Sequence, residues 1–159
     1  MAPARRATLL RSPPDSREEC LGYRRRMGIP AIWPTLRCAD SRALIGFLES
    51  AFGFEASLVV PDGEGSGVIH AQLLWPLGGG VMLGDARSGD ADHLALPSGP
   101  VSIYVVTDQP DALHDRAVAA GARVVRGLRD EEYGSRGFSC LDPEDNVWSF
   151  GTYDPRVSD

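Results

Sequence analysis

The sequence contains no lysine, since all 16 of its basic residues are arginine. Chemistry that needs a lysine amine, such as Schiff-base formation or a lysine held against a phosphate, is therefore excluded. The 159 residues include 22 acidic ones, which gives a net charge of −6. This balance argues against nucleic acid as the main partner.

Cysteine is scarce as well. Cys20, Cys38 and Cys140 are odd in number, widely spaced and never in a Cys-x-x-Cys arrangement, so the sequence indicates neither a disulfide framework nor a zinc site. We interpret them as reduced, mostly structural thiols. The alternative, a catalytic cysteine, needs a histidine partner, and the chain has only three histidines.

Long apolar runs are missing too. The stretch from Ala7 to Leu10 is too short for the apolar core of a signal peptide, and no run approaches the length of a membrane span. Together with the cysteines, this predicts a cytoplasmic protein without a membrane partner.

The N-terminal part of the chain differs in charge from the rest. Residues 1–26 hold seven arginines against three acidic residues, a local net charge of +4 that leaves −10 for the remainder. We interpret residues 1–28 as a flexible basic extension and residues 29–159 as a single domain, because 43% apolar composition suits one core of this size. An arm that contacts nucleic acid or an acidic partner is the alternative to a solvated tail.

The domain contains one pattern twice. An apolar strand ends at Asp40 and a helical run then leads to Gly53, while a second strand ends at Asp108 and a second helical run leads to Gly121. Twelve residues separate Asp from Gly in both copies, and the copies lie about 68 residues apart. The pattern predicts an α+β fold of two tandem βαβββ modules, with module one at 29–86, a linker at 87–99 and module two at 100–153.

Periodicity and turn residues give the elements of each module. For module one we predict strands at 32–38, 54–60, 68–75 and 81–84, with a helix that Asp40 caps and Gly53 ends. For module two we predict strands at 101–106, 123–126, 136–141 and 146–152, with a helix at 110–120.

Three segments carry a resemblance to a known family. They are Leu36 to Asp40, the helix exit Ala51-Phe52-Gly53-Phe54, and the closing stretch from Asp142 to Phe150. With the order of elements, they resemble the vicinal oxygen chelate superfamily, which includes glyoxalase I, extradiol dioxygenases, fosfomycin resistance enzymes and bleomycin resistance proteins. The resemblance implies a cleft between the two curved mixed sheets and, by analogy, a homodimer with clefts at or near its interface.

In metal-dependent members of this family, the ligands come from the first and last strands of each module. The matching positions here are Trp33, Leu83, Val101 and Ser149. A slip of one residue brings in Met82 or Gly84, and Ser102 or Pro100. None offers an imidazole or carboxylate, so we expect no metal and no cofactor. A site built from His70 and Gln72 is the alternative, and it has few ligands.

We therefore expect a cleft for a planar organic molecule, in a metal-free protein of the bleomycin-resistance type that sequesters an aromatic natural product or antibiotic. Trp33, together with Trp75 or Tyr133, stacks on the ligand in this hypothesis, although strand alternation directs Trp75 to the helix side. Other side chains orient the ligand or line the wall. The predicted ligand-binding residues are Trp33, Thr35, His70, Gln72, Trp75, Val101, Ile103, Tyr133, Arg136 and Ser149.

Plainer interpretations stay open beside this one. Trp33 is equally well explained as core, His70 as a half-buried structural histidine, and the loop at 130–135 as an ordinary solvated loop instead of a lid. The rival functional hypothesis is a lyase, isomerase or dioxygenase-like enzyme of the same fold, with His70 as its general base or with an unrecognised metal site.

Overall fold

The computed structural model describes residues 32–63, 66–86 and 98–155. The predicted basic extension and most of the predicted linker lie outside these ranges. Module one consists of β1 (Thr35–Cys38), α2 (Ser41–Phe47) with a π-helical last turn η1 (Leu48–Phe52), β2 (Glu55–Pro61), β3 (Val68–Leu74) and β4 (Gly80–Asp85). Module two consists of β5 (Ser102–Val106), α3 (Pro110–Ala119), β6 (Arg123–Asp130), β7 (Arg136–Leu141) and β8 (Val147–Gly151).

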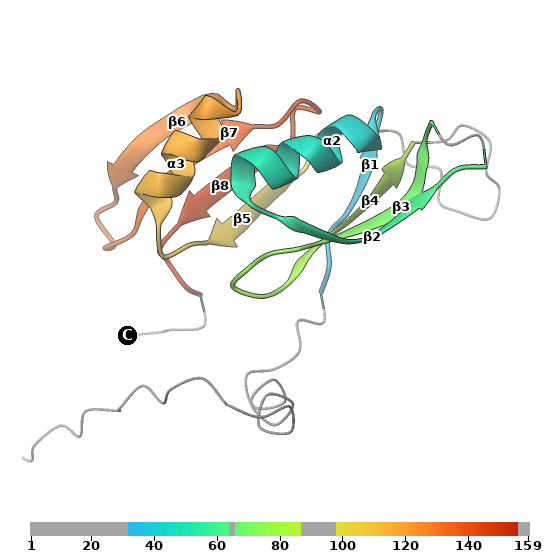
Figure 1. Ribbon diagram of the computed structural model, residues 1–159. Coiled ribbons are helices and arrows are strands. Elements are labelled where there is room, and N and C mark those ends of the chain that lie inside the picture. Colours follow the sequence, from blue (N-terminus) through green and yellow to red (C-terminus); the bar gives the residue numbers. More distant parts are fainter. Residues whose placement is uncertain (1–31, 64–65, 87–97, 156–159) are drawn as a thin grey trace, which may run out of the picture. The chain divides into compact units, whose positions relative to one another are not determined.

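Each module forms one four-stranded mixed sheet, and the two sheets have the same topology (Figure 1). The strand order is β1-β4-β3-β2 in the first sheet and β5-β8-β7-β6 in the second. The first and last strands of each module pair in parallel, and all other neighbours are antiparallel. The predicted α+β fold of two βαβββ modules is confirmed.

The first helix begins and ends at the predicted residues. The side chain of Asp40 accepts a hydrogen bond from the backbone N–H of Ala43 at 2.9 Å, which caps the helix. Gly53 ends it with φ of +86°, and its N–H donates to the carbonyls of Leu48 and Glu49. In module two, Gly121 has the matching φ of +89°, so the repeat read from the sequence is a repeat of backbone conformation.

The two modules share one hydrophobic core, which lies on the helix side of both sheets. Phe52 packs edge-to-face on Phe150 at 4.8 Å between ring centroids, and Phe54 packs on Trp148 at 5.6 Å. Trp75 joins the same cluster, 5.1 Å from Phe54. These aromatic contacts connect the end of the first helix, the residue before β2 and the residue after β3 with strand β8 of the other module.

Polar contacts between the modules surround this core. The indole N–H of Trp75 donates to the carbonyl of Val106 at 3.0 Å, and the guanidinium of Arg116 in α3 donates to the carbonyls of Glu49 and Ser50. The helices α2 and α3 lie side by side in Figure 1. No strand of one sheet pairs with a strand of the other within the described ranges, so core packing and these contacts hold the modules together.

The opposite face of each sheet, which we call its open face, is not part of this core. The helix side of β1 carries Leu36 and Cys38, both buried, while Thr35 on the open face is exposed. The core-facing side of the strand is therefore buried, and its open face is accessible to solvent. None of the helices in the described part of the chain has the length and apolar character needed to cross a membrane.

A buried carboxylate organises the turn between β7 and β8. Asp142 accepts hydrogen bonds from the backbone N–H groups of Glu144 and Asn146, from the Asn146 side-chain amide, and from the indole N–H of Trp148 at 2.8 Å. Asn146 in turn accepts from the backbone N–H of Val101 at the start of β5. One side chain thereby fixes the turn, the largest core aromatic and the entry to β5.

We predict that Asp142→Ala lowers the free energy of unfolding by roughly 3–5 kcal/mol, because each buried donor left without an acceptor costs about 1–3 kcal/mol. Urea denaturation followed by tryptophan fluorescence measures this change. The matched control is Asp145→Asn in the same turn, which removes an exposed ion pair to Arg123 and should cost less than about 1 kcal/mol. Equal losses in the two variants would contradict the role of Asp142.

Burial raises the pKa of Cys38 and of Cys140 to about 12. A raised thiol pKa means that the reactive thiolate forms only as the pH approaches that value, so at about pH 8 roughly one thiol in 10,000 is ionised. We predict that a Cys20→Ser variant does not react with Ellman's reagent at that pH while folded and releases two equivalents of thiolate when unfolded in guanidinium. Rapid reaction of the folded variant would show that the two thiols are accessible.

Candidate ligand-binding site

The open face of the first sheet carries an aromatic ring at one end. Trp33 is half-buried just before β1, and its indole lies over Gly80, where an added β-carbon would lie 2.5 Å from Cζ3 of the ring. The same β-carbon would lie 2.0 Å from the carbonyl oxygen of Leu73. The glycine leaves the space that the indole occupies, so Trp33 lies on the open face as strand alternation predicts.

A cross-strand row of alternating polar and apolar side chains follows next to this ring. Thr35 is paired with Met82, Met82 with Gln72, and Gln72 with Leu58, so one row crosses the four strands. Nε2 of Gln72 lies 3.2 Å from Nε2 of His70. The predicted residues Trp33, Thr35, His70 and Gln72 therefore do lie on one face.

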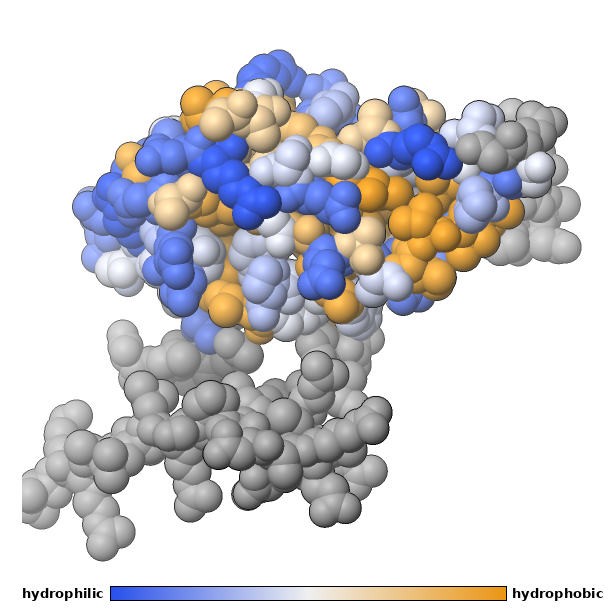
Figure 2. Space-filling view, in the orientation of Figure 1, coloured by the Kyte–Doolittle hydropathy of each residue, from blue (hydrophilic) through white to orange (hydrophobic). Residues whose placement is uncertain are grey.

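The outer edge of the first sheet is apolar. Leu58 and Val60 are exposed beside Gln72 and His70, and Leu74 is exposed on the neighbouring strand. Figure 2 shows an apolar patch over the part of the molecule that β2 and β3 occupy in Figure 1. Strand alternation also predicts that Ile69, like Trp75, faces the helix side, and this was wrong. Ile69 is half-exposed, and Val68 is buried in its place, next to a register irregularity between β2 and β3.

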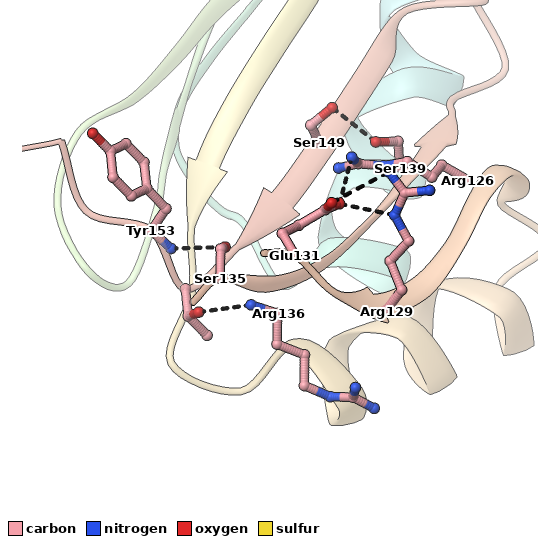
Figure 3. A network of polar contacts seen from close by, with 9 residues as sticks. Arg126, Arg129, Glu131, Ser135, Arg136, Ser139, Ser149 and Tyr153 are labelled. Carbon is pink, nitrogen blue, oxygen red and sulfur yellow. Dashed lines mark hydrogen bonds and ion pairs between the residues drawn. The ribbon is translucent and has the colours of Figure 1, made fainter. Parts of the chain in front are cut away.

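The open face of the second sheet carries a second polar row. Tyr104 is paired with Ser149, Ser149 with Ser139, and Ser139 with Arg126. The hydroxyls of Ser139 and Ser149 share a hydrogen bond of 2.9 Å (Figure 3). The row thus runs from a phenol through two hydroxyls to a guanidinium.

Tyrosines gather at the phenol end of this row. The ring of Tyr104 lies over Gly151, where an added β-carbon would lie 2.7 Å from the Tyr104 hydroxyl oxygen. That hydroxyl donates to the carbonyl of Tyr153 at 2.9 Å, and partial burial raises the pKa of Tyr104. Tyr153 in turn meets Tyr133 edge-to-face at 6.0 Å. All three rings are substantially exposed, which suits stacking with a ligand.

An ion-pair cluster lies at the other end of the row. Oε1 of Glu131 accepts hydrogen bonds from Nη1 of Arg126 at 2.8 Å and from Nε of Arg129 at 2.9 Å. Figure 3 shows the carboxylate held between the two guanidiniums, close to Ser139 and Ser149. The hydrogen bond from Arg129 lowers the pKa of Glu131, so the carboxylate stays ionised at neutral pH.

Three predicted site residues lie elsewhere. Ile103 is paired with Trp148 and packs against the core. It was expected on the open face, and this was wrong because the alternation of side chains along β5 is shifted by one residue from the predicted one. Trp75 packs in the core cluster, which leaves it no part in stacking on a ligand at the open face. Arg136 points to the start of α3, where it forms a two-point ion pair with Asp111 at 2.8 Å and lowers the pKa of that carboxyl.

Two further predictions concern Val101 and Tyr133. Val101 precedes β5, is partly exposed, and uses its backbone N–H and carbonyl in contacts with Asn146 and Val147. Tyr133 is exposed in the hairpin loop between β6 and β7, beside Tyr153. The open face of the second sheet therefore keeps Ser149 from the predicted set, with Tyr133 at its border.

The donor set does not suit a divalent metal. Leu83, one of the predicted equivalents of a ligand position, is buried in the core, and its neighbours Met82 and Gly84 occupy the open-face side of β4. The open-face residues of the first and last strands are otherwise hydroxyl-bearing or apolar, apart from Arg37. Across the residues that the structure describes, no group of three or more His, Cys, Asp or Glu side chains lies close enough to hold a metal ion.

Sequence reasoning missed Tyr104, Arg126, Ser139 and Glu131. The sequence does contain a signal for Tyr104 and Ser139. Trp148 and Phe150 are strong core residues, so Ser149 between them must face the open side, together with its neighbours on the adjacent strands. From that phase, Ser139 follows once the β7–β8 turn sets the register. Arg126 follows less easily, since two irregularities interrupt the pairing of β6 with β7.

Two tandem βαβββ modules, each with one four-stranded mixed sheet, are the architecture of the superfamily that the sequence resembles. A family model for the Glyoxalase/Bleomycin resistance protein/Dioxygenase superfamily matches residues 31–150, and the chain belongs to this family. Its members bind small molecules and often form dimers. Uncharacterized proteins of Mycobacterium bovis and Mycobacterium tuberculosis are 34% identical over 127 residues, which cover 77% of this chain and 82% and 74% of theirs.

Solved structures agree with this assignment. TioX from Micromonospora sp. ML1 is 28% identical with a TM-score of 0.66, covering 76% of this chain and 95% of its own. A glyoxalase/bleomycin resistance protein/dioxygenase family enzyme from Burkholderia phytofirmans is 23% identical with a TM-score of 0.57, covering 75% of this chain and 94% of its own. The second likeness concerns the fold alone.

We predict that Gly80→Ala lowers the free energy of unfolding by about 1–3 kcal/mol and shifts the emission of Trp33, because the added methyl meets both the Leu73 carbonyl and the indole. Thermal unfolding and the emission spectrum measure the two effects. Gly127→Ala is the matched control: Gly127 also lies in a strand, but nothing surrounds its β-carbon position within 4 Å. If both variants unfold like the parent protein, Trp33 is not packed on Gly80.

Proposed function

We propose that the protein binds and sequesters an aromatic small molecule, of the natural-product or antibiotic type, on its open sheet faces. The observation that carries the proposal is a similar combination on each sheet: an aromatic ring over a glycine of the last strand, with hydrogen-bonding side chains nearby on the same face. In module one this is Trp33 over Gly80 with Thr35 and Gln72, and in module two Tyr104 over Gly151 with Ser149 and Ser139.

Stacking and hydrogen bonding divide the work of recognition in this proposal. The exposed phenol of Tyr104 and the half-buried indole of Trp33 offer flat apolar surface to a planar ligand. The amide of Gln72 and the hydroxyls of Ser139 and Ser149 offer donors and acceptors that fix its orientation. Membership in a family that includes bleomycin resistance proteins supports an antibiotic as the ligand class.

We also propose that two chains form the complete site. Within one chain the two sheets pack through their helix sides, so neither open face is closed by the other. In such a dimer, the open face of module one in one chain lies against the open face of module two in its partner. The exposed apolar edge formed by Leu58 and Val60 is surface that this dimer would bury. We propose the cytoplasm as the location of the protein, which suits the free, buried thiols of Cys38 and Cys140.

The first experiment is a titration of intrinsic tryptophan fluorescence with a panel of planar aromatic antibiotics, using metal-analysed protein in the presence of a chelator. Trp75 and Trp148 belong to the core, so quenching by a ligand on the open face should report mainly on Trp33. We expect saturable quenching with a dissociation constant of about 1 µM, about −8 kcal/mol of binding free energy.

Variants of Trp33 and His70 then separate binding from catalysis. Trp33→Leu should weaken binding roughly three- to tenfold, the value of an aromatic contact at about 0.5–1.5 kcal/mol, while the matched Trp33→Phe keeps most of it. Isothermal titration calorimetry measures these affinities, because both variants lack the fluorescent reporter. His70→Gln should lose no more than one hydrogen bond. No saturable quenching by any compound would contradict sequestration, and turnover of a bound compound that depends on His70 would support the enzyme hypothesis instead.

A further inference from the structure

The cluster of Arg126, Arg129 and Glu131 is not used by the proposal above. Two guanidiniums share one carboxylate there, so the cluster keeps one unit of positive charge. The Glu131 side chain is only 15% exposed, whereas those of Arg126 and Arg129 are 35% and 56% exposed. The positive groups therefore border the solvent-accessible side of the face.

Arg126 has donor capacity left over. Its Nη1 donates to Glu131, but its Nε is buried and has no hydrogen-bond partner among the described residues. A guanidinium presents Nε and Nη as a fork that matches two oxygens of one acidic group. Glu131 bonds Nη1, which lies outside the fork that Nε forms with Nη2, so an anion that engages Nε would gain a hydrogen bond that Glu131 does not make.

The position of the cluster relates it to the aromatic end of the site. Arg126 is paired with Ser139, whose hydroxyl is bonded to that of Ser149, the strand neighbour of Tyr104. The row therefore places a stacking ring at one end and a cation at the other. A planar ligand with an acidic group attached to its ring system fits both ends at once.

Glu131 is held in a way that lets its carboxylate be replaced. Its backbone N–H donates to the carbonyl of Ser135 at 2.7 Å, and its own carbonyl accepts from Gly134, which has φ of +82°. These bonds fix the hairpin loop without using the carboxylate, so the side chain can rotate away while the loop stays in place. An acidic group of the ligand would take over the hydrogen bonds of both guanidiniums, which offsets the loss of their ion pairs with Glu131.

We infer that Glu131 is an internal substitute for the acidic group of the ligand, and that Arg126 and Arg129 select planar aromatic compounds that carry a carboxylate or sulfonate. The inference rests on the proposed function, because the aromatic part of such a ligand stacks on the same face. It adds a charge requirement that stacking alone does not impose.

The test compares two probes with one ring system. The probes are 1-anilinonaphthalene-8-sulfonate, which carries a sulfonate, and N-phenyl-1-naphthylamine, which lacks it, and both report binding by their fluorescence. The full-length protein should bind the sulfonate more tightly. Glu131→Gln should strengthen sulfonate binding by about tenfold, about 1.4 kcal/mol, and leave the neutral probe unchanged.

Two arginine variants complete the comparison. Arg126→Gln should weaken sulfonate binding by about tenfold and leave the neutral probe unchanged. Arg123→Gln is the matched control, since it removes the same charge from the same strand. Arg123 pairs with Asp145 in the β7–β8 turn and not with Glu131, so this variant should alter sulfonate affinity by less than about twofold. Circular dichroism checks that each variant is folded.

The possible failures are distinguishable. Equal binding of the two probes, or a Glu131→Gln variant with unchanged sulfonate affinity, overturns the charge requirement and leaves the proposed aromatic binding in place. Failure of both probes to bind overturns the aromatic binding and the inference together. Binding that is unaffected by Tyr104→Leu shows that the probes bind elsewhere, which also overturns the inference.

Discussion

The carboxylate of Asp142 is the constraint on which the second module depends. A buried acid in a turn is costly unless its oxygens are filled, and here four donors from the backbone, Asn146 and Trp148 fill them. The same turn reaches the first module, because Glu144 accepts the backbone N–H groups of Ala39 and Asp40 at the start of α2. Turn, core aromatic and helix start of the other module are thereby fixed together.

With this constraint in place, each strand has one face that packs in the core and one face that is open. Residues such as Leu36, Phe138 and Phe150 point to the shared core, and their immediate neighbours point to the open faces. Rigid core packing then sets the positions of Tyr104, Ser139 and Ser149 without any of them needing to pack there. Recognition can be specific because these side chains project from strands whose opposite face is packed in the core.

The sequence predicted the fold well because its strongest signals are local. The cap at Asp40, the left-handed Gly53 and the repeat of both in module two all follow from backbone conformations that few residues adopt. The site was predicted less well, since a face assignment depends on phase. Thr35, Gln72 and Ser149 were placed on the correct face, while Ile103 was assigned to the wrong one.

Other parts of the site were beyond the reach of pattern alone. Arg136 looked like a ligand contact, but its position on the helix side of β7 pairs it with Asp111, which lies 25 residues earlier and meets it only in the folded chain. Glu131 looked like one of two adjacent loop carboxylates, and only the course of the hairpin shows that it reaches Arg126. Long-range pairing of charges has no short-range sequence signature.

The shared core has a consequence for dividing the chain. Each module, taken alone, would leave one half of the Phe52, Phe54, Trp148 and Phe150 contacts uncovered. A separated module would expose these aromatic rings to water unless it paired with the other module or with a second copy of itself. The two open faces are not bound by this requirement, and one carries an amide and an imidazole while the other carries hydroxyls and guanidiniums.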